Sequence, residues 1–328
     1  MIPSIILFIN NCSGSKTEQA HYKKADLKIN SVEFTSKELI SINHAAAVEN
    51  KIFAIGLKYN IWRINLEEKK EEKIIEMGIG PDEIYKARRL TIHKGRCWVS
   101  TSLNWDKIYI FDILKEKPEV EWFKLPTGIT NIDSLFPISG NIVACVYHGW
   151  EDNLVKIIDR EKGTVKGAGK RTFIKAMRRF NVNVADIFIY KGNAYVTQTI
   201  EPVVQIFSTE PLRKIGAITL SPPFYDPIPK KYDVQKYNRK KHFEWMSRWN
   251  RVHKIFIEDD WVLLRYVRGY KVTFYYELIN LNDKKNRYYI DATSEFIYDF
   301  KVIDGKFIVR SSVENEDDIK WKKGEIII

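Results

Sequence analysis

The chain has 328 residues, of which 45% are hydrophobic, and it contains 17 Tyr, 17 Phe and 9 Trp. This supply of apolar and β-favouring side chains excludes a disordered chain and indicates a folded, strand-rich protein. The formal net charge is +11, from 53 Lys and Arg against 42 Asp and Glu. Such a charge permits an anionic partner, but Lys, Ile and Asn are frequent along the whole chain, so it does not by itself indicate one.

The first segment combines a short apolar run with a cysteine. The run IPSIILFIN (2–10) is too short to span a bilayer, and Cys12 and the sequence SGSK follow it closely. The segment resembles the end of a bacterial lipoprotein signal, in which the cysteine is acylated and becomes the mature N-terminus. The resemblance implies lipidation at Cys12 and a lipid-anchored or exported protein of the cell envelope. The alternative is an ordinary N-terminal segment on a cytoplasmic protein. We assign residues 1–26 to this leader and its linker.

Six later stretches share one pattern, in which an apolar residue precedes a polar turn and an apolar or aromatic strand follows it. They are VENKIFAIG, IHKGRCWVS, ISGNIVACV, IYKGNAYVT, IEDDWVLLR and IDGKFIVRS. Their turns are marked by Asn50, Gly95, Gly140, Gly192, Asp259 and Gly305, at intervals of 45, 45, 52, 67 and 46 residues. Gly, Asn and Asp between apolar runs are hairpin signals.

Six units of about 45 residues, each a four-stranded antiparallel meander, predict an all-β fold, a six-bladed β-propeller. The units begin near residues 42, 88, 132, 184, 251 and 297. The last unit has room for only three strands, and LKINSVEF (27–34) has strand composition but belongs to no other unit. We expect this N-terminal strand to close the last blade and so remove an open sheet edge. The predicted propeller domain spans residues 27–328.

The segment GIGPDEI (78–84) and the strand IYIFDI carry a family resemblance. They are similar to the inter-blade GxGPxE segment and a blade strand of six-bladed propellers of the NHL and TolB-like type, particularly the propeller lipoproteins of Bacteroidetes. Members of that group range from binding modules to lactonases, so the resemblance implies a fold and leaves the function open.

A polar or ionisable residue stands six positions before each turn marker, at the entrance of each innermost strand. These residues are His44, Arg89, Ser134, Asp186, His253 and Asp299. In a propeller they converge on one mouth of the central channel. The two carboxylates and two imidazoles among them could bind a divalent metal or act as acid and base. The alternative, which we favour, is a hydrogen-bonded and ion-paired ring without a cofactor. The set has too few acidic and amide ligands for a lactonase-type calcium site.

Aromatic and basic residues collect in the loops expected at the same face. Two insertions, residues 166–180 and 222–251, lengthen the repeat there, and the second interleaves aromatic with basic side chains. The candidate residues of this loop face are Tyr59, Trp105, Trp150, Trp245, Trp249, Lys240 and Lys241. Such interleaving suits a glycan or an anionic polymer, with nucleic acid less favoured. The alternative is a lid whose tryptophans pack on the propeller.

No motif for nucleophilic catalysis is present, and Cys97 and Cys145 lie in apolar strands, where we expect buried, unpaired thiols. We therefore predict a non-enzymatic, monomeric binding propeller of the bacterial cell envelope, which holds a protein partner or an anionic or glycan ligand at the channel-mouth face. The alternatives are a propeller hydrolase or lyase that uses the His and Asp ring, and an intracellular scaffold.

Overall fold

The computed structural model describes residues 20–39, 41–101, 107–126, 132–147, 153–170, 185–199, 201–226, 247–268 and 273–328. These ranges contain 25 strands, and every regular element within them is a strand. Within the same ranges, no helix has the length and apolar character that a membrane crossing requires. The structure is therefore all-β wherever it is described.

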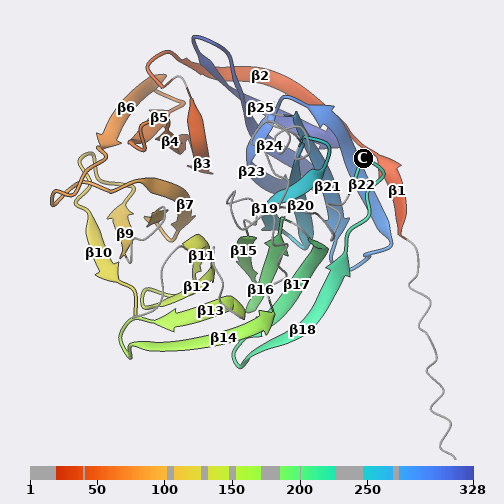
Figure 1. Cartoon of the computed structure of the whole chain (residues 1–328). Coiled ribbons are helices and arrows are strands. Elements are labelled where there is room, and N and C mark those ends of the chain that lie inside the picture. Colours follow the sequence, from red (N-terminus) through yellow and green to blue (C-terminus); the bar gives the residue numbers. More distant parts are fainter. Residues whose placement is uncertain are drawn as a thin grey trace, which may run out of the picture.

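Six sheets, each built around four antiparallel strands, form a ring, which Figure 1 shows along its axis. Blade 1 contains β3 (Ile42–Val48), β4 (Lys51–Gly56), β5 (Ile61–Asn65) and β6 (Lys70–Ile75). Blade 2 contains β7 (Ala87–His93), β8 (Arg96–Thr101), β9 (Lys107–Asp112) and β10 (Glu121–Lys124). Blade 3 contains β11 (Ile132–Pro137), β12 (Ile142–Tyr147), β13 (Asn153–Asp159) and β14 (Thr164–Lys170).

Blade 4 contains β15 (Ala185–Tyr190), β16 (Asn193–Gln198), β17 (Glu201–Thr209) and β18 (Leu212–Thr219). Blade 5 contains β19 (Asn250–Glu258), β20 (Trp261–Arg268), β21 (Thr273–Asn280) and β22 (Asn286–Thr293). Blade 6 contains β23 (Phe296–Ile303), β24 (Lys306–Glu314), β25 (Ile319–Ile327) and β2 (Asp26–Ser36). The six-bladed propeller is thus confirmed, and each blade begins within one residue of its predicted start.

The innermost strands β3, β7, β11, β15, β19 and β23 contact one another in turn around the axis, and β23 meets β3. Between each pair of neighbouring blades lies one buried apolar cluster. Cys97 belongs to the cluster between blades 1 and 2, and Cys145 to the cluster between blades 2 and 3. Both are buried and outside any disulfide, as predicted, and Cys145 Sγ donates to the carbonyl of Lys156 at 3.6 Å. Burial raises the pKa of the Cys97 thiol, which keeps it protonated and unreactive.

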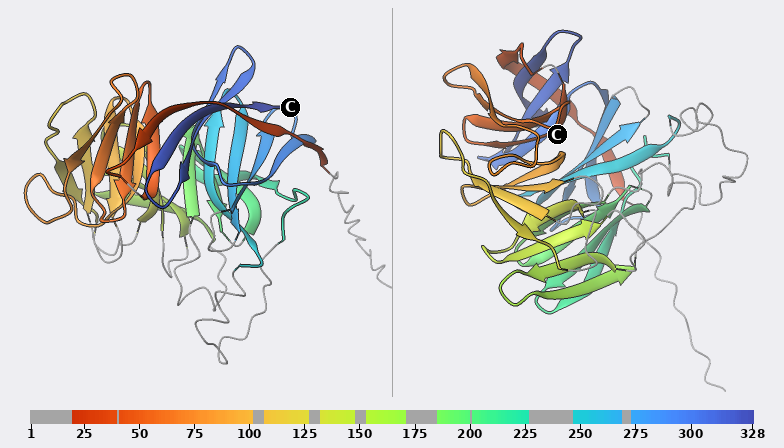
Figure 2. Two further views of the ribbon diagram at one scale, coloured as in Figure 1. Left: turned by 90° about the horizontal axis from the view of Figure 1, so that it is seen from above. Right: turned by 60° about the vertical axis from the view of Figure 1, so that its left-hand side comes forward.

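The N-terminal strand β2 closes blade 6 by antiparallel pairing with β25, from Asp26 opposite Ile327 to Ser36 opposite Ile319. Figure 2 shows the red N-terminal strand beside the dark blue C-terminal one. The fully buried Trp321 locks the pairing, because its indole Nε1–H donates a hydrogen bond of 2.7 Å to Ser36 Oγ. The closing strand predicted at residues 27–34 is confirmed, with slightly wider bounds.

A further strand, β1 (His21–Lys24), lies within the segment that the sequence assigned to the linker. It pairs in parallel with β22 and gives blade 5 a fifth strand. Its sequence HYKK is short and mostly polar, so hydrophobic periodicity does not predict it. Tyr22 fastens it from the side, because its hydroxyl donates to Glu277 Oε1 at 2.8 Å and accepts the N–H of Ser221 at 3.1 Å.

In three of the six blades the first hairpin uses the predicted tight turn with glycine. Lys94 and Gly95 both have positive φ, as do Lys191 with Gly192 and Asp304 with Gly305. This is the backbone conformation of a type I′ turn. In blade 5 the two turn residues are Asp259 and Asp260, with φ of 47° and 62°. The residue that matches Gly95 is therefore Asp260, one position beyond the predicted marker Asp259.

The GIGPDEI segment forms the connection between β6 and β7. Glu83 organises it, because its Oε2 accepts the N–H of Gly80 at 2.6 Å. A Cβ at Gly78 would lie 2.0 Å from that same oxygen, so only glycine leaves room for the carboxylate in this position. The motif that carries the family resemblance therefore has a structural role at the junction of blades 1 and 2.

We expect Trp321→Ala to lower the free energy of unfolding by about 3–5 kcal/mol, because it opens a cavity at the closing strand and removes a buried hydrogen bond. Trp122→Ala is the matched control, since Trp122 is 51% exposed on β10 and its ring centre lies 3.6 Å from the Lys107 ammonium. It should cost about 1 kcal/mol or less. Urea unfolding followed by far-ultraviolet circular dichroism measures both. Equal losses would contradict the role given to Trp321.

Candidate functional site

Five of the six residues predicted at the channel mouth lie at one level of the innermost strands. His44, Arg89, Ser134, Asp186 and Asp299 pair there with the second strand of their own blade. In blade 5 the structure places Lys254 at this level, opposite Arg265, and His253 one residue earlier. The predicted position was counted six residues back from Asp259. The residue that matches the turn glycine of the other blades is Asp260, so the equivalent position is Lys254.

The innermost strands carry a β-bulge just before this level in every blade except blade 4. The bulge residues are Asn43, Arg88, Asp133, His253 and Tyr298. A bulge bends the strand and re-aims the side chains around it. Arg88 and Asp133 form an ion pair of 3.0 Å, and Asp133 Oδ2 also accepts the N–H of Ala185 at 3.2 Å. Bulge residues thus join blades 2, 3 and 4.

Asp186 is the centre of a buried polar cluster that we call the hub, formed by Arg89, Ser134, Asp186, Lys254, Arg265, His44 and His253. Asp186 Oδ1 accepts hydrogen bonds from Ser134 Oγ at 2.6 Å and from Arg89 Nη1 at 2.8 Å. Its Oδ2 accepts the backbone N–H of Ile255 at 3.0 Å. The Lys254 ammonium lies 3.4 Å from Oδ1 and 3.3 Å from Oδ2. One carboxylate therefore ties blades 2, 3, 4 and 5 together.

The same contacts fix the charge of Asp186. Burial alone would raise the pKa of its carboxyl, but Lys254, Arg89, the Ser134 hydroxyl and the Ile255 N–H together hold it below its ordinary value. Burial lowers the pKa of Lys254, an effect that Asp186 opposes and Arg89 reinforces. Asp186 is consequently an anion with its lone pairs committed to protein donors.

Both hub histidines are neutral. Burial, followed by the repulsion of nearby cations, lowers the pKa of His44 and of His253 well below the ordinary value. His44 Nδ1 accepts the N–H of Leu90 at 3.4 Å, and His253 Nδ1 lies 3.0 Å from Nη2 of Arg265. Because arginine can only donate, His253 Nδ1 is the acceptor in that contact.

Arg265 is a buried cation without a carboxylate within 4.0 Å in the described ranges. Its Nη1 donates to the carbonyl of Ile297 at 2.7 Å, and its guanidinium carbon lies 3.9 Å from the ring centre of Phe296. Burial, with repulsion from Arg89, lowers the pKa of Arg265 to about 10, although Tyr276 and Asp186 act in the opposite direction. Among the described residues, Arg265 therefore adds a positive charge that is not paired with a carboxylate.

Asp299 lies apart from the Asp186 contacts, on the wall of the central channel. Burial raises the pKa of its carboxyl, and Lys301 and Arg310 partly offset this effect. Within the described ranges, no three His, Cys, Asp or Glu side chains come close enough together to hold a metal ion. The structure thus does not assemble Asp186, His253, Asp299 and His44 into one ligand set among these residues.

A cavity of about 170 Å³ lies in the central channel. His44, Lys254 and Asp299 contribute to it at the level of the hub, and its far end reaches Ala47, Glu258 and Lys301. These last residues precede the first hairpin turns, whereas the channel mouth was predicted at the opposite face, where the innermost strands begin. The hub therefore forms the floor of a cavity that extends toward the hairpin turns.

Most candidates of the loop face lie outside the described residues: Trp105, Trp150, Trp245, Lys240 and Lys241, together with the lipidation candidate Cys12. Tyr59 lies between β4 and β5 with a positive φ of 63° and is 36% exposed. Trp249 is half-buried just before β19. The first insertion begins as part of β14, and its remainder, residues 171–184, is not described.

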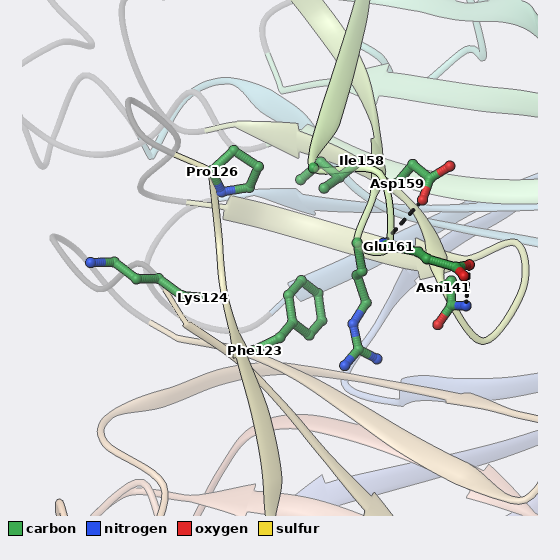
Figure 3. A pocket seen from close by; sticks show the side chains of 9 residues that line it. Phe123, Lys124, Pro126, Asn141, Ile158, Asp159 and Glu161 are labelled. Atoms are coloured by element: carbon green, nitrogen blue, oxygen red, sulfur yellow. Dashed lines mark hydrogen bonds between the residues drawn. The ribbon is translucent and has the colours of Figure 1, made fainter.

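A groove of about 600 Å³ lies at the rim between blades 2 and 3 (Figure 3). The Arg160 guanidinium carbon lies 4.2 Å from the ring centre of Phe123, and Asn141 Nδ2 donates to Glu161 Oε2 at 3.1 Å. Two basic residues, Lys124 and Arg160, and two acidic residues, Asp159 and Glu161, line the groove. Its lining therefore does not select a ligand by charge. No local sequence pattern predicts this groove, because a strand of one blade and the turns of the next form it together.

No family model matches the sequence, and no curated protein matches it. Solved structures do match the fold. A member of the DUF4221 family from Bacteroides vulgatus superposes with a TM-score of 0.62 at 10% identity, covering 92% of this chain and 98% of its own. A Bacteroides fragilis protein, described by its name as exported, has a TM-score of 0.61 at 10% identity. The match covers 93% of this chain and 95% of that protein. A Bacteroides thetaiotaomicron protein of unknown function has a TM-score of 0.57 at 10% identity, covering 92% and 76%. These likenesses show the propeller fold alone; the NHL and TolB-like resemblance stays a prediction.

We expect the free energy of unfolding to fall as the pH drops below about 6.5. The folded protein keeps His44 and His253 neutral, whereas the unfolded chain protonates them in this window and so binds more protons. Stability therefore rises with pH up to about 6.5, with a slope of at most about 1.4 kcal/mol per pH unit for each imidazole. Urea unfolding at several pH values should show a smaller slope for His44→Gln combined with His253→Gln. His21→Gln, on the exposed side of β1, should keep the slope of the unmodified protein.

Proposed function

We propose that the protein is a non-enzymatic binding propeller of the bacterial cell envelope, with its ligand held in the central channel. The observation that carries the proposal is that the hub and the adjacent cavity differ in composition. The ionisable groups of the hub are bonded mainly to one another, while the cavity beside them keeps aromatic and alanine walls together with a few polar groups. Small-molecule sites have this composition.

The arrangement favours binding over hydrolysis. A general base needs an uncommitted acceptor beside the reacting proton, but Asp186 accepts from Ser134, Arg89 and the Ile255 N–H. The neutral imidazoles face cations or a backbone N–H, and a divalent metal ion beside them would be repelled by Arg89, Lys254 and Arg265. Within the described ranges, Asp186 and the hub histidines therefore lack the uncommitted acceptor that a propeller hydrolase or lyase would need from them.

The location in the envelope is supported by two separate observations. One structural neighbour of the same fold is named as an exported protein. The N-terminal apolar run, followed closely by Cys12, resembles the end of a lipoprotein signal. We propose that the chain resembles NHL and TolB-like propeller lipoproteins in this respect, with the loop face available to a protein or glycan partner.

The envelope location is tested by labelling with palmitate in a Gram-negative host. The unmodified protein should incorporate label and fractionate with membranes, and Cys12→Ser should do neither. Cys97→Ser is the control, since Cys97 is buried in a core cluster and removing its thiol should leave labelling unchanged. An unlabelled, cytoplasmic wild-type protein would remove the envelope from the proposal.

The binding function is tested by equilibrium dialysis of the purified protein against a small-molecule cell extract, followed by mass spectrometry. We expect the protein to retain compounds of unchanged mass. Ala46→Leu narrows the channel at a half-buried lining residue, so the variant should lose those compounds while keeping the thermal midpoint of the wild type. Conversion of a retained compound into a product would favour the hydrolase or lyase, and retention by Ala46→Leu would place the ligand elsewhere.

A further inference from the structure

We propose that the central channel takes a small organic monoanion, in which an apolar or single-ring body carries one carboxylate that contacts Lys254. This inference rests on the binding function proposed above and deepens it by naming the ligand class. It follows from the charge of the hub, the free donor capacity of Lys254, and the shape and charge of the cavity.

The hub has more positive than negative charge. Arg89, Lys254 and Arg265 are cations, both histidines are neutral, and Asp186 is the carboxylate that contacts Arg89 and Lys254. Buried charge is costly unless a partner compensates it. Arg265 has carbonyl, imidazole and aromatic contacts, none of which carries a full negative charge. A bound anion at the floor of the cavity would lower this cost, so the hub selects for negative charge.

Lys254 is the hub cation that reaches the cavity. Its two contacts with Asp186, at 3.3 and 3.4 Å, are longer than those from Ser134, Arg89 and the Ile255 N–H. An ammonium has three N–H donors, and Asp186 supplies only two oxygens, so at least one donor lacks an acceptor in the described structure. The Lys254 side chain is 15% exposed. A ligand carboxylate can therefore take this donor without displacing Asp186.

His44 supplies a second donor at the same level. Its Nδ1 accepts the N–H of Leu90, so in the neutral ring the proton resides on Nε2. His44 also lines the cavity. An ammonium and a neutral imidazole N–H that line the same cavity suit the two oxygens of a carboxylate.

The walls of the cavity determine the rest of the ligand. Blade 1 contributes Ala45, Ala46 and Ala47 in succession, which leaves space opposite the rings of Phe136, Phe188 and Phe256. A cavity of about 150 Å³ is enough for benzene, so the volume of about 170 Å³ suits a single ring or an apolar body of similar size.

The acidic groups of the cavity limit the ligand to one negative charge. Asp299 lies at the hub level, and Glu258 lies at the open end, where it pairs with Lys301 at 3.6 Å. With the first carboxylate held at Lys254, a second one directed toward the open end would meet Glu258, and like charges in a partly desolvated channel repel strongly. A monoanion avoids this repulsion.

Isothermal titration calorimetry with three matched probes tests the ligand class: phenylacetate, its neutral analogue phenylacetamide, and the dianion phenylmalonate. Phenylacetate should bind at least tenfold more tightly than either analogue. Lys254→Met should weaken phenylacetate at least tenfold and leave phenylacetamide unchanged. Lys166→Met makes the same change in net charge on the exposed strand β14 and should have no effect. Ala46→Leu, which is expected to keep the thermal midpoint of the wild type, should weaken the binding of all three probes.

Equal affinity for phenylacetate and phenylacetamide, or unchanged phenylacetate binding by Lys254→Met, would overturn the inference. The dialysis experiment distinguishes failure of the anionic ligand class from failure of the binding function. If dialysis retains only neutral or cationic compounds in a channel-dependent way, the binding function stands and the anionic ligand class falls. If dialysis retains nothing, or the retained compounds are converted, the binding function itself falls.

Discussion

The pairing of β2 with β25 is the constraint on which the rest of the structure depends. Without β2, blade 6 would present the unpaired backbone of β25, and the cluster between blades 6 and 1 would lose one wall. That cluster contains Trp321, Tyr298 and Ala45, so it connects the closing strand to the innermost strands on both sides. Because the channel exists only while six innermost strands surround it, the closure at the rim determines the cavity at the centre.

The N-terminal region fastens a second blade through a buried acid. Glu277 accepts hydrogen bonds from Tyr266 and Tyr22, and Arg287 pairs with it at 3.3 Å. Burial raises the pKa of Glu277, an effect that these donors oppose. Arg287 also donates to the carbonyl of Thr219 at 2.6 Å, which extends the cluster to blade 4. Strand β1 therefore pairs with blade 5 and strand β2 with blade 6, and the next strand along the chain, β3, begins blade 1.

The sequence predicts local features of this fold well and contacts around the ring poorly. Hairpin turns such as Lys94–Gly95 are visible because glycine tolerates positive φ, and they place the blades. In blade 5 the turn has no glycine, and choosing the wrong Asp of the pair moved the predicted ring position from Lys254 to His253. A slip of one residue in a strand exchanges the side chains of its two faces.

Other parts of the candidate site have no local signal. Arg89 and Asp186 are 97 positions apart and come from blades 2 and 4, so only the closed ring shows that they pair. Arg265 lies in the second strand of its blade and reads as an ordinary strand residue, although it decides the charge of the hub. The polar character of the ring positions was therefore predictable, but the pairings and the excess of cations were not.

One innermost strand, β15, lacks a bulge, and this difference explains why Asp186 is the central acceptor of the hub. Strand β15 of blade 4 pairs with β16 without a bulge, whereas the five other innermost strands each contain one near the hub. The regular strand supplies the acceptor Asp186, and the bulged strands of blades 2, 3 and 5 supply Arg89, Ser134 and Lys254 as donors. Bulges re-aim side chains, so donors from three blades can meet one fixed carboxylate. Since that carboxylate is committed to the scaffold, Lys254 is the donor of this set that also lines the channel cavity.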